Sequence, residues 1–279
     1  KIQSANNHLL KLENKTLKFV SVIADITVGS ILCHFATKLI IISVVDTQIK
    51  CRLPLVMFGD IAVPTGLQNA DPCVTRGCLW PKATDGNVYV PFRIANSFSK
   101  ETIIEGLRSF AESTCIRFTP LDRQEDFVDI QSLSGCFSFV GRRGRGQVVS
   151  LSRQGCVFRQ IIQHELLHAL GFNHEQTRSD RDQNVPNWGF ISRMESNFRK
   201  IQTMNLGTPY DYNSVMHYGR FAFSKNRQPT IVPIPDANVA IGRATQMSPI
   251  DILRVNRLYR CSTYLLKQNF CPTRWPLPQ

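Results

Sequence analysis

The hydrophobic positions between residues 97 and 113 recur at helical spacing. They place four apolar side chains on one face of a helix, which is the pattern of a helix packed on a core. Ser97 or Ser99 is expected to cap its start, because a serine hydroxyl accepts a bond from the first free backbone N–H groups. The apolar residues of this face are Ile103, Ile104, Leu107 and Phe110.

Short runs rich in β-branched and aromatic residues surround this helix and predict strands. A strand over residues 88–92 is expected to end near Pro91. Further strands are predicted at 116–118, 127–130, 136–140 and 147–151.

Three more helices follow these strands. One is predicted over residues 157–170, and a short one near 191–201. The last is predicted over 248–259, with Ser248 as its N-cap and Pro249 in the first helical position. Between them, proline, glycine, asparagine and aspartate are frequent, so loops dominate that half.

The chain divides into three parts by its pattern. Residues 1–68 are poorly periodic and end close to the turn formers Val63-Pro64-Thr65-Gly66. Residues 69–262 hold the regular elements, and residues 263–279 form a proline-containing tail. The most apolar stretch, residues 17–49, fits a membrane helix or a buried strand. Its internal charges disfavour the membrane helix, so we expect no membrane association.

The net charge of the chain indicates which kinds of molecule it could bind. The formal net charge is +12, from 33 basic and 21 acidic residues. Such a balance suits nucleic acid, anionic membranes or acidic proteins. The densest cluster, Arg142-Arg143-Gly144-Arg145, has no interleaved aromatic residues and is interpreted as a solvated loop. We therefore expect no nucleic-acid partner.

The nine cysteines form no CxxC pair, which disfavours a zinc ribbon or a redox motif. Scattered cysteines favour disulfides and hence a secreted protein. The sequon Asn14-Lys15-Thr16 agrees with that compartment.

The chemistry concentrates in the eleven residues from 164 to 174, HELLHALGFNH. His164 and His168 project from the same helical face, four residues apart. Gly171 ends the helix and lets the chain return His174 toward them. Three neutral imidazoles and an open fourth position are typical of a catalytic zinc site.

Zinc lowers the pKa of a bound water to about 7, and Glu165 is placed to take that proton and deliver it to a leaving amine. Two plainer interpretations remain: satisfied core histidines and a non-catalytic zinc site. Half of the six histidines fall in this short stretch, which disfavours the first. A non-catalytic site would not need Glu165.

The run from His164 to Asp182, HELLHALGFNHEQTRSDRD, resembles the extended signature of the astacin family of metzincin endopeptidases. Downstream, Ser214-Val215-Met216-His217-Tyr218 resembles that family's Met-turn. Residues 69–73 and 78–82 resemble its hatching-enzyme, six-cysteine branch. The resemblance implies an α+β metzincin fold: a mixed sheet with the zinc helix, then a largely irregular second subdomain with a final helix.

The resemblance also implies a role for each matching residue. His164, His168 and His174 would bind one Zn²⁺, and Glu165 would be the general base. Tyr218 would stabilise the oxyanion, because a phenol donates a hydrogen bond while neutral. Met216 would lie beneath the metal, and Glu175 would bind the new amino terminus after maturation.

The first region would be an inhibitory prosegment. Phe58-Gly59-Asp60 resembles the family's zymogen motif, in which the aspartate takes the open position on zinc. An activating protease would remove residues 1–68. The implied disulfides are Cys115–Cys261, Cys136–Cys156 and Cys73–Cys78.

Substrate contacts are implied as well. The strand Cys136-Phe137-Ser138-Phe139 would bind the substrate backbone by strand addition. Arg243 is a candidate for binding an acidic side chain after the scissile bond. We therefore expect a secreted zinc endopeptidase made as a zymogen, acting on proteins such as those of an egg envelope. The alternative is a non-catalytic binding protein of an egg or mucosal surface that keeps the fold.

Overall fold

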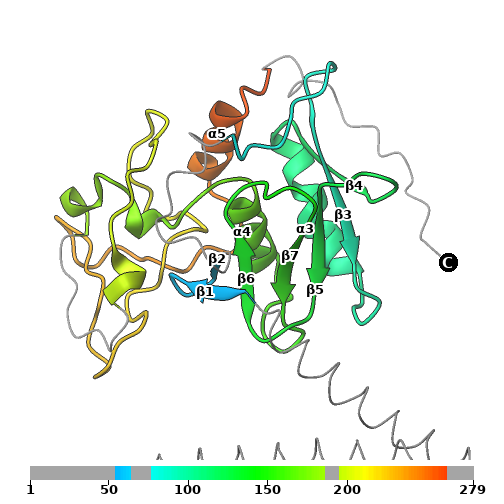
Figure 1. Cartoon of the computed structure of the whole chain (residues 1–279). Coiled ribbons are helices and arrows are strands. Elements are labelled where there is room, and N and C mark those ends of the chain that lie inside the picture. Colours follow the sequence, from blue (N-terminus) through cyan, green and yellow to red (C-terminus); the bar gives the residue numbers. More distant parts are fainter. Residues whose placement is uncertain (1–53, 64–76, 186–194, 263–279) are drawn as a thin grey trace, which may run out of the picture. The chain divides into compact units, whose positions relative to one another are not determined.

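A computed structural model of the chain describes residues 54–63, 77–185 and 195–262 (Figure 1). The chain divides into two compact units, Lys1–Leu53 and Pro54–Gln279, and every described residue belongs to the second. The predicted boundary at residue 68 and the tail from residue 263 lie outside the described ranges. Within those ranges, no helix combines the length and the apolar character needed to cross a membrane.

A seven-stranded mixed sheet forms the centre of the fold. Strands β7, β5, β3 and β4 run parallel to one another, whereas β6 runs antiparallel to β7. The β1–β2 hairpin extends the sheet beyond β6. In spatial order the strands are β1 (Leu55–Met57), β2 (Ile61–Val63), β6 (Cys136–Phe139), β7 (Gly146–Leu151), β5 (Phe127–Gln131), β3 (Val88–Ile94) and β4 (Ile116–Pro120).

The predicted strands after residue 77 are all present, with one correction. Pro91 lies inside β3 instead of ending it, because the strand continues to Ile94. At Pro91 only β4 pairs with β3, since pairing with β5 begins at Phe92. Proline, which lacks a backbone N–H, is tolerated where one side of a strand is open.

Two helices, α3 (Glu101–Ser113) and α4 (Arg159–Ala169), cover the sheet and share its main core (Figure 1). The predicted core face of α3 is confirmed, because Ile103, Leu107 and Phe110 are buried. The predicted cap is wrong. Lys100 occupies the N-cap without a side-chain bond, and Ser99 donates to the Glu101 carboxylate instead.

A close contact between helices sets their spacing. A Cβ built on Gly106 would lie 2.6 Å from Cγ2 of Ile162, so α3 and α4 approach more closely than a larger residue would allow. Both bridges that the structure describes tie the ends of elements together. They are Cys115–Cys261, from the start of β4 to the end of the final helix, and Cys136–Cys156, from β6 to the loop before α4.

After α4 the chain is mostly irregular, with its own small core. The helix predicted near 191–201 is only partly confirmed: residues 195–201 are described, and of these only Glu195–Phe198 are helical, as the 3₁₀ turn η4. The final helix α5 (Pro249–Leu258) begins as predicted, because Ser248 caps it and Asp251 completes a capping box. The small core consists of Val185, Phe198, Tyr210, Ile231 and Ile241.

Candidate metal centre

The end of α4 determines where three histidines lie. Gly171 has φ +108°, a value that favours glycine. Its N–H donates to the carbonyl of His168 (2.8 Å), and the Phe172 N–H donates to the carbonyl of Leu167 (3.0 Å). This pair of bonds is a Schellman motif, which ends the helix and reverses the chain. His174 is thereby brought back to the face that carries His164 and His168.

The three imidazoles converge on the carboxylate of Asp60 in the turn between β1 and β2. The Nε2 atoms of His164 and His174 lie 3.1 and 2.8 Å from the nearer Asp60 oxygen, and Nε2 of His168 lies 3.4 Å away. All four candidate ligand atoms lie within 4.8 Å of one another. Three nitrogens and one carboxylate oxygen at this spacing fit a four-coordinate zinc ion.

Burial keeps two of these imidazoles in the form that binds metal. It lowers the pKa of His168 to about 4 and also lowers the pKa of His174. His164 behaves differently: burial also acts to lower its pKa, but the bond and charge of Asp60, the charge of Glu165 and the bond to Val215 together outweigh burial and raise the pKa to about 9. The buried cluster therefore contains at least two neutral imidazole donors at neutral pH.

Backbone carbonyls orient two of the three rings. Nδ1 of His164 donates to the Val215 carbonyl (2.8 Å), and Nδ1 of His168 donates to the Phe172 carbonyl (2.7 Å). Such contacts fix the tautomer and the direction of a metal-binding histidine. Nδ1 of His174 has no partner among the described residues.

Glu165 lies beside the first histidine and is almost fully buried, at 1% exposure. Its Oε2 atom has no hydrogen-bond partner among the described residues. Burial raises the pKa of this carboxyl. The charge of His164 acts to lower the pKa and the charge of Asp60 acts to raise it, and the net shift is upward. A buried carboxyl of raised pKa in this position can act as a general base.

Tyr218 faces the cluster from the second half of the chain. Its ring centroid lies 4.5 Å from that of His174, and its hydroxyl donates to the carbonyl of Phe58. Phe58 and Gly59 both have positive φ, +52° and +86°. A Cβ on Gly59 would lie 2.5 Å from the Tyr218 hydroxyl, so a larger residue there would have to displace that hydroxyl and adopt a strained φ.

Asp251 holds the segment predicted as the Met-turn, residues 214–218. It accepts bonds from the Ser214 hydroxyl (2.6 Å) and the Val215 N–H (2.9 Å). Since the Val215 carbonyl orients His164, α5 supports the first histidine through a single residue, Val215. Met216 is buried at 3% exposure and belongs to the main core, and its place beneath the metal stays a prediction.

The β1–β2 hairpin covers the strand predicted to bind substrate. Strand β2 runs parallel to β6, with Ile61 opposite Ser138 and Ala62 opposite Phe139. The Ser138 N–H donates to the backbone carbonyl of Asp60 (2.9 Å). The backbone groups of β6 on this side are therefore already bound by the chain's own residues.

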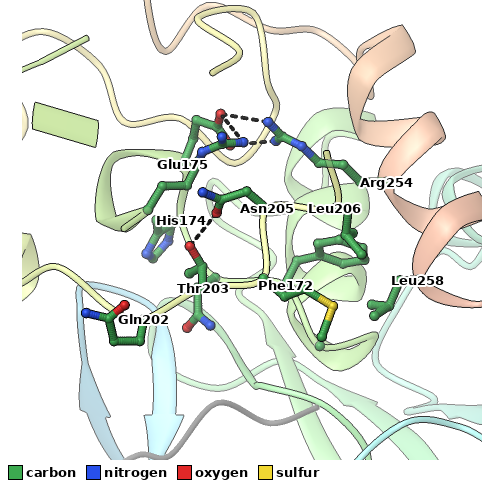
Figure 2. Close-up of a pocket in the computed structure, with 13 residues that line it drawn as sticks. Phe172, His174, Glu175, Gln202, Thr203, Asn205, Leu206, Arg254 and Leu258 are labelled. Carbon is green, nitrogen blue, oxygen red and sulfur yellow. Dashed lines mark hydrogen bonds and ion pairs between the residues drawn. The ribbon is translucent and has the colours of Figure 1, made fainter. Parts of the chain in front are cut away.

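Two other predicted residues are not among the four candidate metal ligands. Glu175 is buried against Arg254, at the edge of a cavity of about 250 Å³ (Figure 2). Arg243 lines a hollow beside the start of α5. A different cavity, of about 350 Å³, adjoins His164 and Glu165, and it is lined by Gly242 and Ala244 but not by Arg243. The roles predicted for Glu175 and Arg243 stay predictions, as does the Cys73–Cys78 bridge, since Cys73 lies outside the described residues.

Three residues that support the cluster were not foreseen from the sequence. Asp251 and Arg254 are on α5, far along the chain from the histidines. Phe58 belongs to the Phe58-Gly59-Asp60 motif, but the contact with Tyr218 is made by its backbone carbonyl, which the motif does not predict. Asp251 lies three residues after the predicted cap Ser248, the spacing of a capping box, but no local pattern links it to His164.

Comparisons with known proteins agree with this geometry. Residues 79–260 match the family model described as Astacin, a peptidase family. The low choriolytic enzyme of Oryzias latipes is 50% identical over 210 residues, which cover 73% of this chain and 77% of that protein. High choriolytic enzyme 1 of the same fish is 48% identical over 213 residues, covering 74% and 78%.

A solved structure is similar as well. It is that of high choriolytic enzyme 1, a hatching enzyme zinc-protease from Oryzias latipes. It superposes with a TM-score of 0.66 at 48% identity, covering 70% of this chain and 100% of that one.

Proposed function

The chain belongs to the astacin family of peptidases and is a zinc-dependent endopeptidase, and we propose that His164, His168 and His174 hold its zinc ion. The observation that carries this assignment is the convergence of three imidazoles and Asp60 within 4.8 Å. When bound, zinc supplies a Lewis acid that acidifies a water and polarises a peptide carbonyl.

Glu165 is the general base in this proposal. Its unpartnered Oε2 takes the proton of the attacking water, and the carboxyl then delivers that proton to the leaving amine. Burial supports both steps, because the raised pKa lets the group hold a proton between them. Among the described residues, the only carboxylate grouped with the imidazoles at metal-binding distance is Asp60, which belongs to the covering hairpin.

Tyr218 stabilises the oxyanion once its hydroxyl is free. In this structure that hydroxyl donates to the Phe58 carbonyl. A substrate carbonyl would replace Phe58 as acceptor, and a neutral phenol is a suitable donor for developing negative charge. Burial raises the pKa of Tyr218, so the hydroxyl keeps its proton at neutral pH.

The hairpin at residues 54–63 keeps the enzyme inactive in three ways. Asp60 occupies the fourth ligand position beside the three imidazoles, the Phe58 carbonyl accepts the hydrogen bond of the Tyr218 hydroxyl, and β2 pairs with β6. An activating protease that removes residues 1–68 would release all three contacts together. Strand β6 would then accept the backbone of a protein substrate by strand addition.

The substrate we propose is a protein of an egg envelope, in a secreted setting. The support is sequence identity: the chain is 50% and 48% identical to two choriolytic enzymes, and one of these is a hatching enzyme of known structure. The alternative, a non-catalytic surface-binding protein, is not favoured, since a binding protein would need neither Glu165 nor a removable Asp60.

Replacement of Glu165 tests the proposal. Matured Glu165→Gln protein should keep its zinc and lose peptide hydrolysis by about 10²–10⁴-fold, the usual contribution of a general base. Glu112→Gln, on an exposed position of α3, is the matched control and should hydrolyse like the parent. Hydrolysis by the Glu165 variant at the rate of the control would refute the assignment.

A further inference from the structure

The third histidine is held differently from the other two. His164 and His168 each donate Nδ1–H to a backbone carbonyl. Nδ1 of His174 has no such acceptor among the described residues, although the ring is buried at 1% exposure. Metal-binding histidines almost always have this outer contact. The direction of the His174 ring therefore depends on the backbone that carries it.

That backbone is fixed by the next residue, Glu175. Its N–H donates to the carbonyl of Met216 (3.0 Å), which ties the histidine to the predicted Met-turn. Its carboxylate accepts the N–H of Asp211 (2.7 Å) through Oε1. Glu175 thus joins His174 to two separate loops, and its side chain is buried at 2% exposure.

Arg254 supplies the charge that this buried carboxylate needs. Nη1 donates to Oε2 of Glu175 (2.5 Å) and Nη2 to Oε1 (2.9 Å), a bidentate pair visible in Figure 2. The rest of the guanidinium is also used: Nε donates to the Thr208 hydroxyl (2.8 Å) and Nη2 to the Pro209 carbonyl (2.9 Å). A bidentate arginine fixes direction as well as charge.

Arg254 is the principal ion-pair partner of Glu175, because the other nearby cation, Arg178, is bound to a different carboxylate. Arg178 lies 3.6 Å from Glu175, but its guanidinium binds Asp180 in bidentate fashion at 2.8 and 2.7 Å. An ionised carboxylate offers about four acceptor positions. Two are filled by Arg254 and one by the Asp211 N–H, while Arg178 approaches Oε1, the oxygen that already accepts two of these bonds. Both oxygens of the Glu175 carboxylate therefore already accept a hydrogen bond in the uncleaved chain.

We propose that Arg254 is the positioning residue of the third histidine: through Glu175 it fixes His174 while the chain is still uncleaved. This inference rests on the proposed zinc site. Maturation then has one effect on the metal site: removal of the hairpin uncovers three histidine ligands that are already in place. A new amino terminus would join Glu175 as an additional partner and not as the group that builds the site.

The test uses cobalt(II) as the metal probe in the full, uncleaved chain. All variants carry Asp60→Ala, so that the hairpin supplies no ligand. Adding Arg254→Met should weaken cobalt binding about 10- to 100-fold, the usual cost of losing an outer-shell contact. It should also shift the ligand-field absorption bands, whereas Arg254→Lys should restore part of the affinity.

Two controls separate positioning from general loss of stability. Arg257→Met, on an exposed arginine of the same helix that contacts only loop carbonyls, should leave cobalt affinity within about twofold. Glu175→Met with Arg254→Met replaces the buried pair by apolar groups, which often restores stability. We expect this double variant to recover its metal-free melting temperature without recovering cobalt affinity.

The outcomes are distinguishable. Equal cobalt affinity and spectra in the Arg254→Met chain would overturn the inference, as would recovery of affinity together with stability in the double variant. Cobalt binding that appears only after removal of residues 1–68 would also overturn it. A parent chain that binds no cobalt before or after cleavage would refute the zinc site itself.

Discussion

The two halves of the described chain reach the same site by different means. Before Gly171, a periodic sheet and two helices bury a continuous core, and His164, Glu165 and His168 sit on that frame. After Gly171, regular structure is sparse, and single polar contacts such as Asp251 to Val215 position the chain. Stability in the first half should therefore depend on packing, and in the second half on individual buried polar groups.

The largest expected effect is a cavity in the first half. Phe110→Ala removes a fully buried ring from between α3 and the sheet, and such changes cost about 3–5 kcal/mol. Urea unfolding of the full chain should show this loss. The control, Phe221→Ala, removes an exposed ring of the second half and should change stability by less than about 0.5 kcal/mol. Similar losses in both variants would contradict the contrast.

The next effect tests the second half through a polar group. Asp251→Ala leaves the Ser214 hydroxyl and two N–H groups without their acceptor, at about 1–3 kcal/mol for each group left buried and unpaired. We expect a total of about 3 kcal/mol by urea unfolding, with weaker zinc binding. Asp236→Ala, at an exposed turn, is the control. An unchanged zinc affinity would remove Asp251 from the support of His164.

The third prediction concerns the pH dependence of stability, which a buried histidine of the second half should dominate. Burial lowers the pKa of His217 to about 4, whereas the unfolded value is about 6.5. The unfolded chain binds the proton first, so this contribution is complete above about pH 6.5 and is lost as pH falls toward 4. Between pH 7 and 5 the loss should be about 2 kcal/mol larger in the parent than in His217→Gln, measured by urea unfolding at saturating zinc. Parallel pH curves would contradict it.

The smallest effect concerns the covering hairpin. Gly59→Ala places a side chain at a positive φ, which is strained for alanine, and brings its Cβ against the Tyr218 hydroxyl. The strain alone costs about 1–2 kcal/mol, so the open form of the uncleaved chain should rise about tenfold. Peptide hydrolysis before cleavage measures it. Gly155→Ala has the same kind of backbone strain in open space and should leave that hydrolysis unchanged.

What the sequence could predict follows the same division. The helical spacing of His164 and His168, the role of Gly171 and the Ser248 cap are local signals, and each was found at its expected position. The serine cap of α3 was not, because Ser99 binds Glu101 instead.

The contacts that sequence reasoning missed are long-range. Arg254 meets Glu175 across 79 residues, and Tyr218 meets Phe58 across 160. No periodicity specifies such pairs, because each depends on how irregular loops fold back on the frame. Asp60 was foreseen only through a family motif, and its three histidine contacts required the tertiary structure.

Zinc K-edge X-ray absorption of the uncleaved chain tests the central assignment most directly. The parent should show one zinc with three imidazole nitrogens and one carboxylate oxygen at short, four-coordinate distances. Asp60→Ala should keep all three imidazoles and lose only the carboxylate contribution. Fewer than three imidazoles in the parent, or loss of an imidazole together with Asp60, would contradict a site built jointly by the two halves of the chain.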